Sequence, residues 1–435
     1  MSRPGPNQTA SELEEALQLA IAAEDDAGCR IALRHHPVIV PAEPTAHGEP
    51  GWPTAKLSSG TAVLVYTSTT SLHEATGGWP HRVEEVLITQ IMCAIPDPTW
   101  SIVINAALPD QLVLPPSQLA RVACSSVEDD LRGGAPAFML KPLTPVAADA
   151  LLREHDPAVS GYVYPFIDLA PVSSAYELAQ ALVPGDEEAY LDETGAVHYV
   201  VWTAHFPSLY HPAVGGNDLH TRAVLDGPVL DDPPLRGNGL SPSRDFPIRE
   251  YWVSRAVLPH RAALLRYRGP DHVEVLGSYD GLARTWAGYD GASAPTMPAP
   301  ADPLSPVLLP YAGAVVTAPG GDLVDAVVGF GDDEQLRVWT RDRMPTVEDP
   351  SSLSATEPVV EHLRRAIDID GHPAVIVASD DERVLVELAV PDRQLADQLG
   401  FPRVERGVRR KWVDRSAVSE VIALRDQARW PGSAR

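Results

Sequence analysis

Side chains that could do acid–base chemistry gather between residues 190 and 300, where histidine, arginine and acidic residues occur close together. Imidazole and carboxylate groups can take up or give a proton, and a guanidinium group can hold a phosphate. The candidate enzyme site in this stretch consists of His205, His211, Arg255, Tyr279 and Asp280. Their types support one hypothesis, an enzyme that acts on a nucleotide-like substrate.

The spacing of the histidines does not favour a metal centre. The four histidines at the start of this stretch are His198, His205, His211 and His220. They are separated by seven, six and nine residues, so no two of them share a helical face as the HExxH pattern requires. The chain also has an odd number of cysteines without a CxxC pair, which we expect to be buried free thiols: Cys29, Cys93 and Cys124. We therefore predict neither a metal nor a cofactor.

Motifs for a catalytic nucleophile or for phosphate binding are also missing. The sequence has no GxSxG pattern, and its cysteines lie outside the histidine-rich stretch. The glycine-dense loops Val214–Asn217 and Pro319–Asp322 lack the Walker pattern and are typical of turns. The sequence thus predicts no catalytic residue, and we expect a protein that is not an enzyme.

The charge of the chain narrows the class of partner. The 435 residues carry a formal net charge of −25, and such a field repels nucleic acid and anionic membrane surfaces but suits a basic protein. Residues 1–9 lack the apolar core of a signal peptide, and no apolar run approaches the ~18 residues of a membrane span. We expect a cytoplasmic protein with a protein partner, and neither a nucleic acid nor a membrane partner.

The first domain that the sequence predicts spans residues 10–127. Two short apolar runs, Gly60–Ser68 and Ser101–Asn105, are typical of buried strands, with a helical pattern between them from Val83 to Ala94. The other elements that we expect here are a helix over 11–23, a strand over 38–40, an edge strand over 112–114 and a helix that ends near 123. Together they predict a compact α/β sandwich.

The predicted secondary structure changes twice along the rest of the chain. Residues 136–185 read as a second α/β piece, which either completes the first domain or stands alone, and residues 190–290 as a β-rich domain with an antiparallel meander after 262. A proline-rich linker leads to an α+β domain over 307–435. For that domain we expect a hairpin over 374–390 and helices over 358–367 and 416–429. The fold class is α+β and α/β, with several domains.

The order of elements over residues 10–127 resembles the SseB amino-terminal domain family. In that family the second strand ends in an aromatic-Thr-Ser triplet and a later strand in Asn-Pro; here Tyr66, Thr67, Ser68 and Asn105 match, and Ala106 replaces the proline. The resemblance implies an adaptor or chaperone rather than catalysis. Many actinobacterial members are similar to proteins encoded near secretion systems or toxins, and the rest of this chain resembles no family known to us.

Polar side chains at the ends of these strands are the candidate partner-binding site. Open α/β sheets place ligand contacts at the carboxyl ends of their strands, where Tyr66, Thr67, Ser68 and Asn105 are expected. Trp52 and Trp79, in loops beside proline or glycine, are the aromatic candidates for an interface. The alternative is structural, because threonine, serine and asparagine also stabilise turns without any partner.

The sequence favours a non-enzymatic protein-binding adaptor or chaperone, associated with a bacterial secretion system or toxin locus. The charge, the resemblance and the missing catalytic motifs all support this interpretation. Two alternatives stay open at this point: an enzyme with its site in residues 190–300, and a structural scaffold without a specific ligand.

Overall fold

In the computed structural model the described residues are 6–41, 43–44, 50–78, 82–124, 127, 138–154, 158–204, 206–230, 247–259, 262–280, 285–288, 308–317, 323–330, 336–340, 360–418 and 420–427. The fold mixes helices with strands in several sheets, as the sequence predicts. The chain forms two compact units. The first unit combines residues 1–125 with 212–250, and the second combines 126–211 with 251–435.

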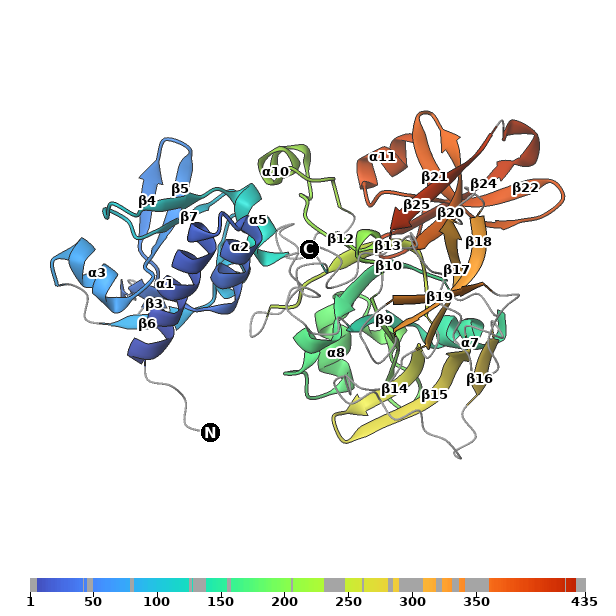
Figure 1. The fold of residues 1–435 in the computed structure, drawn as a ribbon, viewed down its shortest axis with the longest axis horizontal. Helices are drawn as coiled ribbons and strands as arrows, with labels where there is room; N and C mark the ends of the chain where they lie inside the picture. Colours follow the sequence, from blue (N-terminus) through green and yellow to red (C-terminus); the bar gives the residue numbers. More distant parts are fainter. Residues whose placement is uncertain are drawn as a thin grey trace. The chain divides into compact units, whose positions relative to one another are not determined.

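The first unit is built of short helices and strands (Figure 1). Its elements are α1 (Pro6–Ala22), α2 (Asp26–His35), β1 (Val38–Pro41), β2 (Glu43–Pro44), β3 (Pro50–Gly51), β4 (Thr54–Leu57), β5 (Gly60–Val65), α3 (Thr69–Thr76), β6 (Val83–Val86), α4 (Ile88–Ala94), β7 (Ser101–Ile104), β8 (Leu112–Leu114), α5 (Pro116–Ala123) and α10 (Leu219–Leu225). The expected first helix and the strands that begin at 38, 60, 101 and 112 are all present.

The central sheet of the first unit has the strand order β4-β5-β7-β8. β5 and β7 run parallel, with Val65 opposite Ile104, whereas β4 and β8 pair antiparallel on either side. Apolar residues of α1, α2, α4 and α5 pack with Val65 and Ile104 in one core, because each helix presents an apolar face to the sheet. The two buried strands predicted to begin at 60 and 101 are present, and they pair with each other in parallel.

The helix predicted over 83–94 is wrong in its first part. Val83–Val86 forms β6, which pairs antiparallel with β1, and the helix α4 begins only at Ile88. The apolar residues of this stretch fit a helical period, but Val83 and Val86 lie in a sequence of β-branched and acidic residues that β1 can pair. The ladder with β1 therefore outweighs the local helical pattern.

The second unit begins with a long antiparallel sheet, here called the middle sheet, with the order β12-β13-β10-β9-β11-β14-β15-β16. Its elements and the helices beside it are β9 (Phe138–Leu143), α7 (Pro145–Glu154), β10 (Ala158–Pro165), η1 (Phe166–Leu169), α8 (Ala175–Leu182), α9 (Glu187–Tyr190), β11 (Val197–Thr203), η2 (Pro207–Leu209), β12 (His211–Pro212), β13 (Tyr251–Val257), β14 (Ala263–Gly269), β15 (His272–Asp280) and β16 (Thr285–Gly288). β9 and β10 share this sheet with β11, so the α/β piece over 136–185 and the β-rich stretch after 190 are joined by strand pairing.

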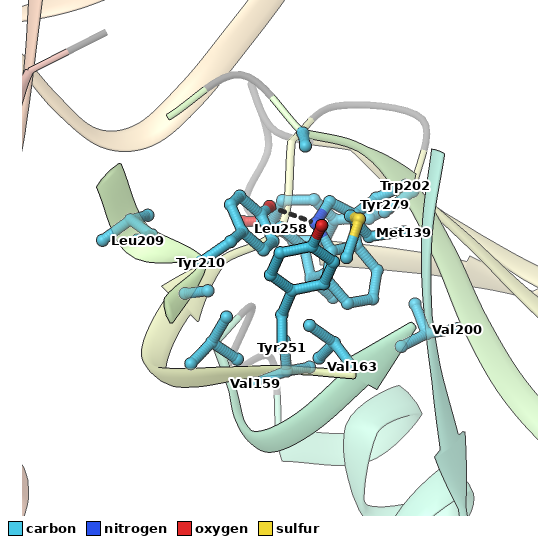
Figure 2. Packing of buried hydrophobic residues seen from close by; sticks show 14 of the residues in the cluster. Met139, Val159, Val163, Val200, Trp202, Leu209, Tyr210, Tyr251, Leu258 and Tyr279 are labelled. Atoms are coloured by element: carbon cyan, nitrogen blue, oxygen red, sulfur yellow. Dashed lines mark hydrogen bonds between the residues drawn. The ribbon is translucent and has the colours of Figure 1, made fainter. Parts of the chain in front are cut away.

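Large aromatic residues fill the core of the middle sheet, as Figure 2 shows. The Trp202 indole N–H donates a hydrogen bond to the Tyr210 hydroxyl at 2.8 Å, so both buried polar atoms have a partner. Tyr251 and Tyr279 lie in the same cluster, each 1 % exposed or less. The expected antiparallel meander is present as β14, β15 and β16.

The carboxyl-terminal strands form another sheet, with the order β19-β18-β17-β20-β21-β22-β24-β23 and β25 paired to β20. Its elements are β17 (Leu308–Thr317), β18 (Leu323–Phe330), β19 (Leu336–Thr340), β20 (Val360–Ile369), β21 (His372–Ser379), β22 (Arg383–Leu388), α11 (Arg393–Gln398), β23 (Arg403–Glu405), β24 (Val408–Asp414), η5 (Arg415–Ala417) and β25 (Val421–Gln427). The expected hairpin is present as β21 and β22, and Asp380 accepts the backbone N–H groups of Glu382 and Arg383 in its turn.

Both helices predicted in this region are wrong. Residues 360–369 form β20 and residues 421–427 form β25, and these two strands pair with each other from Glu361 opposite Gln427 to Ile367 opposite Val421. Each stretch contains Leu, Ala and Arg, which favour a helix in isolation. The paired residues lie about 60 positions apart in the chain, and a local sequence pattern cannot reveal such a contact.

Candidate functional site

The carboxyl ends of the parallel strands β5 and β7 bring together the residues that sequence analysis singled out there. Thr67 donates its backbone N–H to the Asn105 side-chain oxygen at 2.9 Å, and the Asn105 amide donates to Asp110 at 2.7 Å. Asn105 has a φ of 53°, a left-handed conformation that asparagine tolerates better than most residues. One side chain thereby connects the end of β5 with the turn that leads to β8.

A carboxylate from the first helix completes this network. Glu14 of α1 accepts hydrogen bonds from the hydroxyls of Thr67 at 2.8 Å and Ser71 at 3.1 Å. Ser68 caps α3, since its hydroxyl accepts the backbone N–H of Ser71 at 3.0 Å. The polar atoms that end β5 are thus used to hold α1, α3 and the 105–111 turn in place.

The burial of these residues limits what a partner could touch. Thr67, Ser68 and Asn105 are each 8 % exposed or less. Tyr66 is 5 % exposed and packs with Ile39 and Leu72, and burial raises the pKa of its hydroxyl. These four residues lie together as predicted, but in this structure their side chains bond to one another and pack into the first unit. Their contribution to binding would be to position the surface around them.

The two tryptophan candidates differ in what the structure says of them. Trp52 is half-buried and packs against the core of the first unit, so only part of its ring is available to a partner. Trp79 lies outside the described residues.

The edge of the sheet beside this network is exposed, and sequence analysis did not single it out as a site. In the part of the chain that the structure describes, β8 is the last strand of the β4-β5-β7-β8 sheet. Leu112 and Val113 of this strand are 44 % and 38 % exposed, whereas Leu114 is buried. The Asn105–Asp110 bond fixes the turn that leads into β8. The available signal was a short apolar run that ends in Pro115 and Pro116.

The alternative enzyme residues are used in different ways. Tyr279 is 1 % exposed and packs against Trp286, with 5.6 Å between ring centroids, as part of the aromatic core. Asp280 ends β15, and its side chain lies outside the described residues, as does the whole of His205. His211 and Arg255 instead lie where β13 meets the carboxyl-terminal strands.

We call this second place the seam: the surface along which β9, β10 and β13 contact residues 362–426. His211 lies against the Trp252 ring, with 6.0 Å between centroids. Arg255 has a φ of 52°, and its backbone N–H donates to the Ser160 hydroxyl at 2.9 Å. Side chains from β20 and β22 bond to Ser254 of β13, and Arg364 of β20 also bonds to Asp426 of β25. The seam thus gathers charged groups from parts of the chain far apart in sequence.

A further polar cluster lies on the middle sheet and includes residues that sequence analysis missed. Arg266 donates from Nε to Asp192 at 2.7 Å and from its Nη atoms to Thr194 at 2.8 Å and Glu274 at 3.3 Å. Burial by itself raises the pKa of Asp192, but hydrogen bonds from Thr194, Ala196 and Arg266 outweigh it and hold this pKa well below the usual range. The guanidinium is engaged on every nitrogen, so the cluster fastens the turn at 192–196.

Metal chemistry has no centre in the described part of the chain. No group of three or more His, Cys, Asp or Glu side chains in these ranges is arranged to hold an ion. Cys93 and Cys124 are buried in the core of the first unit, and burial together with Asp26 and Asp25 raises the pKa of the Cys29 thiol. None of the helices described has the length and apolar composition that crossing a membrane requires.

Comparison of the chain with protein-family models, with curated proteins and with solved structures finds no match.

Proposed function

We propose that this chain is a non-enzymatic adaptor or chaperone that binds another protein, and that it serves a bacterial secretion system or a toxin locus. The proposal takes the first unit to be an SseB-like domain. The element order behind that resemblance is a helix, a strand that ends at Pro41, a strand followed by Tyr66-Thr67-Ser68 and a strand followed by Asn105.

The observation that carries the proposal is the exposed edge strand β8. An unpaired strand edge offers backbone N–H and C=O groups to an extended segment of another protein, and side chains along the edge supply specificity. Leu112 and Val113 add apolar area at this edge. Hydrogen bonds that link the buried Thr67 and Asn105 to Asp110 hold the preceding turn, so the strand is already in the conformation that a partner strand needs.

The charge of the first unit indicates the chemistry of the partner. Residues 1–125 and 212–250 together contain nineteen acidic and ten basic side chains. A β-forming segment flanked by lysine or arginine would be attracted to this surface, and the attraction would weaken as salt screens it. The partner that we propose is therefore an extended, apolar segment of a basic protein, added antiparallel or parallel to β8.

Affinity purification of the tagged chain from its own host, at low and at high salt, tests the proposal. We expect one partner in stoichiometric amount that is depleted at high salt. Val113→Glu places a charge on the edge strand and should lower recovery of that partner by about tenfold or more.

The matched control is Leu219→Glu, which makes the same kind of change at an exposed apolar residue of α10 in the first unit. Leu219→Glu should recover the partner like the unmodified chain. The proposal fails if no partner exceeds background, or if Val113→Glu and Leu219→Glu recover equal amounts of it.

A further inference from the structure

The seam between the middle sheet and the carboxyl-terminal strands is built from buried polar contacts. Lys141 of β9 donates to Glu405 at 3.0 Å, and its side chain is 7 % exposed. The Ser254 hydroxyl donates to Glu387 at 2.9 Å, and Glu387 also accepts from Arg410 at 2.9 Å. Such contacts hold two surfaces together only while each charge keeps its partner, because a buried unpaired charge is costly.

Aromatic rings complete the seam around the turn between β23 and β24. The Trp252 indole N–H donates to the Gly407 carbonyl at 2.6 Å. Arg406 places its guanidinium 4.3 Å from the centroid of the Tyr162 ring and donates to the Tyr164 hydroxyl at 2.8 Å. Opening of the seam would therefore uncover aromatic rings on β10 and β13.

His362 of β20 is the exception among these partnered groups. It is fully buried and packs against the Phe206 ring, with 5.6 Å between centroids. Neither ring nitrogen has a hydrogen-bond partner among the described residues. A neutral imidazole tolerates this site at some cost, whereas an imidazolium would have two unsatisfied N–H donors and a full charge in an apolar setting.

The charges around His362 add to this effect. The groups that face it in the described residues are Arg255 from β13 and Arg364 from its own strand, and Asp426 of β25 lies opposite it in the register. Arg364 donates to the Ser254 carbonyl at 2.8 Å and to Asp426 at 3.0 Å, so the carboxylate is already engaged. β17, which also pairs with β20, has no acidic or basic residue in its sequence. Burial, followed by the positive charges of Arg364 and Arg255, lowers the pKa of His362 to about 3.

The pKa of His211 is shifted in the same direction near the Arg364–Asp426 pair. Although this residue is exposed to solvent, the protein around its ring lowers its pKa, Arg364 lowers it further, and Asp426 opposes both. Two histidines that resist protonation thus lie near one arginine whose hydrogen bonds close the seam.

We propose that the seam is an acid-sensitive latch, in which protonation of His362 releases the carboxyl-terminal strands from β9, β10 and β13. The sign follows from linkage. His362 excludes a proton while the seam is closed and accepts one at its ordinary pKa of 6.5 when it is open. Closure is therefore fully favoured above pH 6.5 and weakens as the pH falls from there toward 3, by about tenfold per pH unit. The device resides in the second unit and does not depend on the edge strand β8.

A cysteine probe in the full chain measures the opening of the seam. Val408 is 1 % exposed and lies against Gly161, so Val408→Cys buries a thiol within the seam. Its labelling by 4,4′-dithiodipyridine, divided by the rate for the same denatured variant at each pH, gives the open fraction. Between pH 6.5 and 4.5 we expect this fraction to rise about fiftyfold, because the open form is already half protonated at pH 6.5, and by less than about threefold when His362→Phe is added.

Two controls separate the latch from general acid unfolding. Val200→Cys places the probe in the core of the middle sheet, where labelling should stay low over the same range. His372→Phe makes the same substitution at the β20–β21 turn, where His372 pairs with Ile369, and should leave the pH response of Val408→Cys unchanged. The latch is refuted if His362→Phe leaves that response unchanged, or if Val200→Cys becomes labelled in parallel with Val408→Cys.

A second measurement covers the case in which His362→Phe does not fold. In the unmodified chain, imidazole NMR signals report protonation directly. One buried histidine should stay neutral down to pH 5 while the seam remains closed. If every histidine signal titrates near pH 6.5 in the closed form, the proposal is wrong.

Discussion

Thr67 has one hydroxyl proton and two nearby acceptors, the Glu14 carboxylate at 2.8 Å and the Asn105 carbonyl at 3.1 Å. The Thr67 hydroxyl donates its proton to Glu14 in the shorter, charge-assisted bond, and the Asn105 side-chain oxygen accepts the Thr67 backbone N–H. This arrangement fixes the orientation of the Asn105 amide, with its oxygen toward Thr67 and its nitrogen toward Asp110. A single residue therefore decides where the turn before β8 lies.

Replacement of Asn105 should show how much this residue contributes. Asn105→Ala leaves the buried Thr67 N–H without its acceptor and puts alanine at a φ of 53°. Each effect costs about 1–2 kcal/mol, so we expect the free energy of unfolding of the first unit to fall by about 3 kcal/mol in urea. Gln111→Ala removes an exposed acceptor of the same turn and should cost less than about 1 kcal/mol. A loss below about 0.5 kcal/mol for Asn105→Ala would contradict this account.

At the scale of elements, the turn between β23 and β24 depends on glycine. Gly407 has a φ of 73°, and a Cβ atom there would lie 2.8 Å from the Tyr162 ring and 3.2 Å from Trp252. Gly400 has a similar φ of 70°, but a Cβ atom there would meet nothing within 4 Å. A comparison of substitutions at Gly400 and Gly407 thus distinguishes the cost of backbone strain from the cost of a clash with the aromatic rings of the seam.

Alanine substitution at these two positions tests that distinction. Gly400→Ala carries only the strain of the left-handed conformation, about 1 kcal/mol. Gly407→Ala adds the clash with the Tyr162 ring and should lower the free energy of unfolding of the second unit by about 3 kcal/mol. Denaturation in urea measures both values. Equal losses at the two glycines would mean that the turn is not held against the aromatic rings as described.

Charged groups at the same seam explain why its strands could not be recognised from the sequence. β20 contains Val360, Leu363 and Ile367, which lie at helical spacing among arginine and glutamate. In the structure His362 and Ala366 are buried, and each lies two positions from Arg364 on the strand. β25 pairs with β20 from Glu361 to Ile367. When a polar residue is buried through pairing with a distant strand, the alternation of apolar and polar residues that identifies a strand in the sequence is lost.

At the scale of the whole molecule, the two units have separate apolar cores. One core gathers residues of α1, α2, α4 and α5 with β5 and β7, and others lie on the middle sheet and within the carboxyl-terminal strands. Units that each have their own core can unfold in separate transitions, and the seam joins the two cores of the second unit. Calorimetry of the full chain should show two transitions, of which Asn105→Ala lowers only one and Gly407→Ala only the other. A single transition that moves as a whole with either substitution would refute this division.

Elements that depend on local signals could be predicted from the sequence. The turn at Asp380, the buried runs that form β5 and β7 and the antiparallel meander after 262 follow from residue types within a few positions of one another. The sequence also located Thr67, Ser68 and Asn105 at neighbouring strand ends, because parallel strands bring their carboxyl ends to one edge of a sheet.

What those elements do for one another depends on contacts that form only in the folded chain. In the folded chain Thr67 and Asn105 are buried and support the turn before β8. His211 and Arg255 lie at the seam, whereas Tyr279 lies in an aromatic core. Residues 212–250 joined the first unit although strands of the second unit flank them in the chain. These outcomes depend on contacts between residues far apart in sequence, and a local pattern of residue types holds no information about which distant surface will remove water from a side chain.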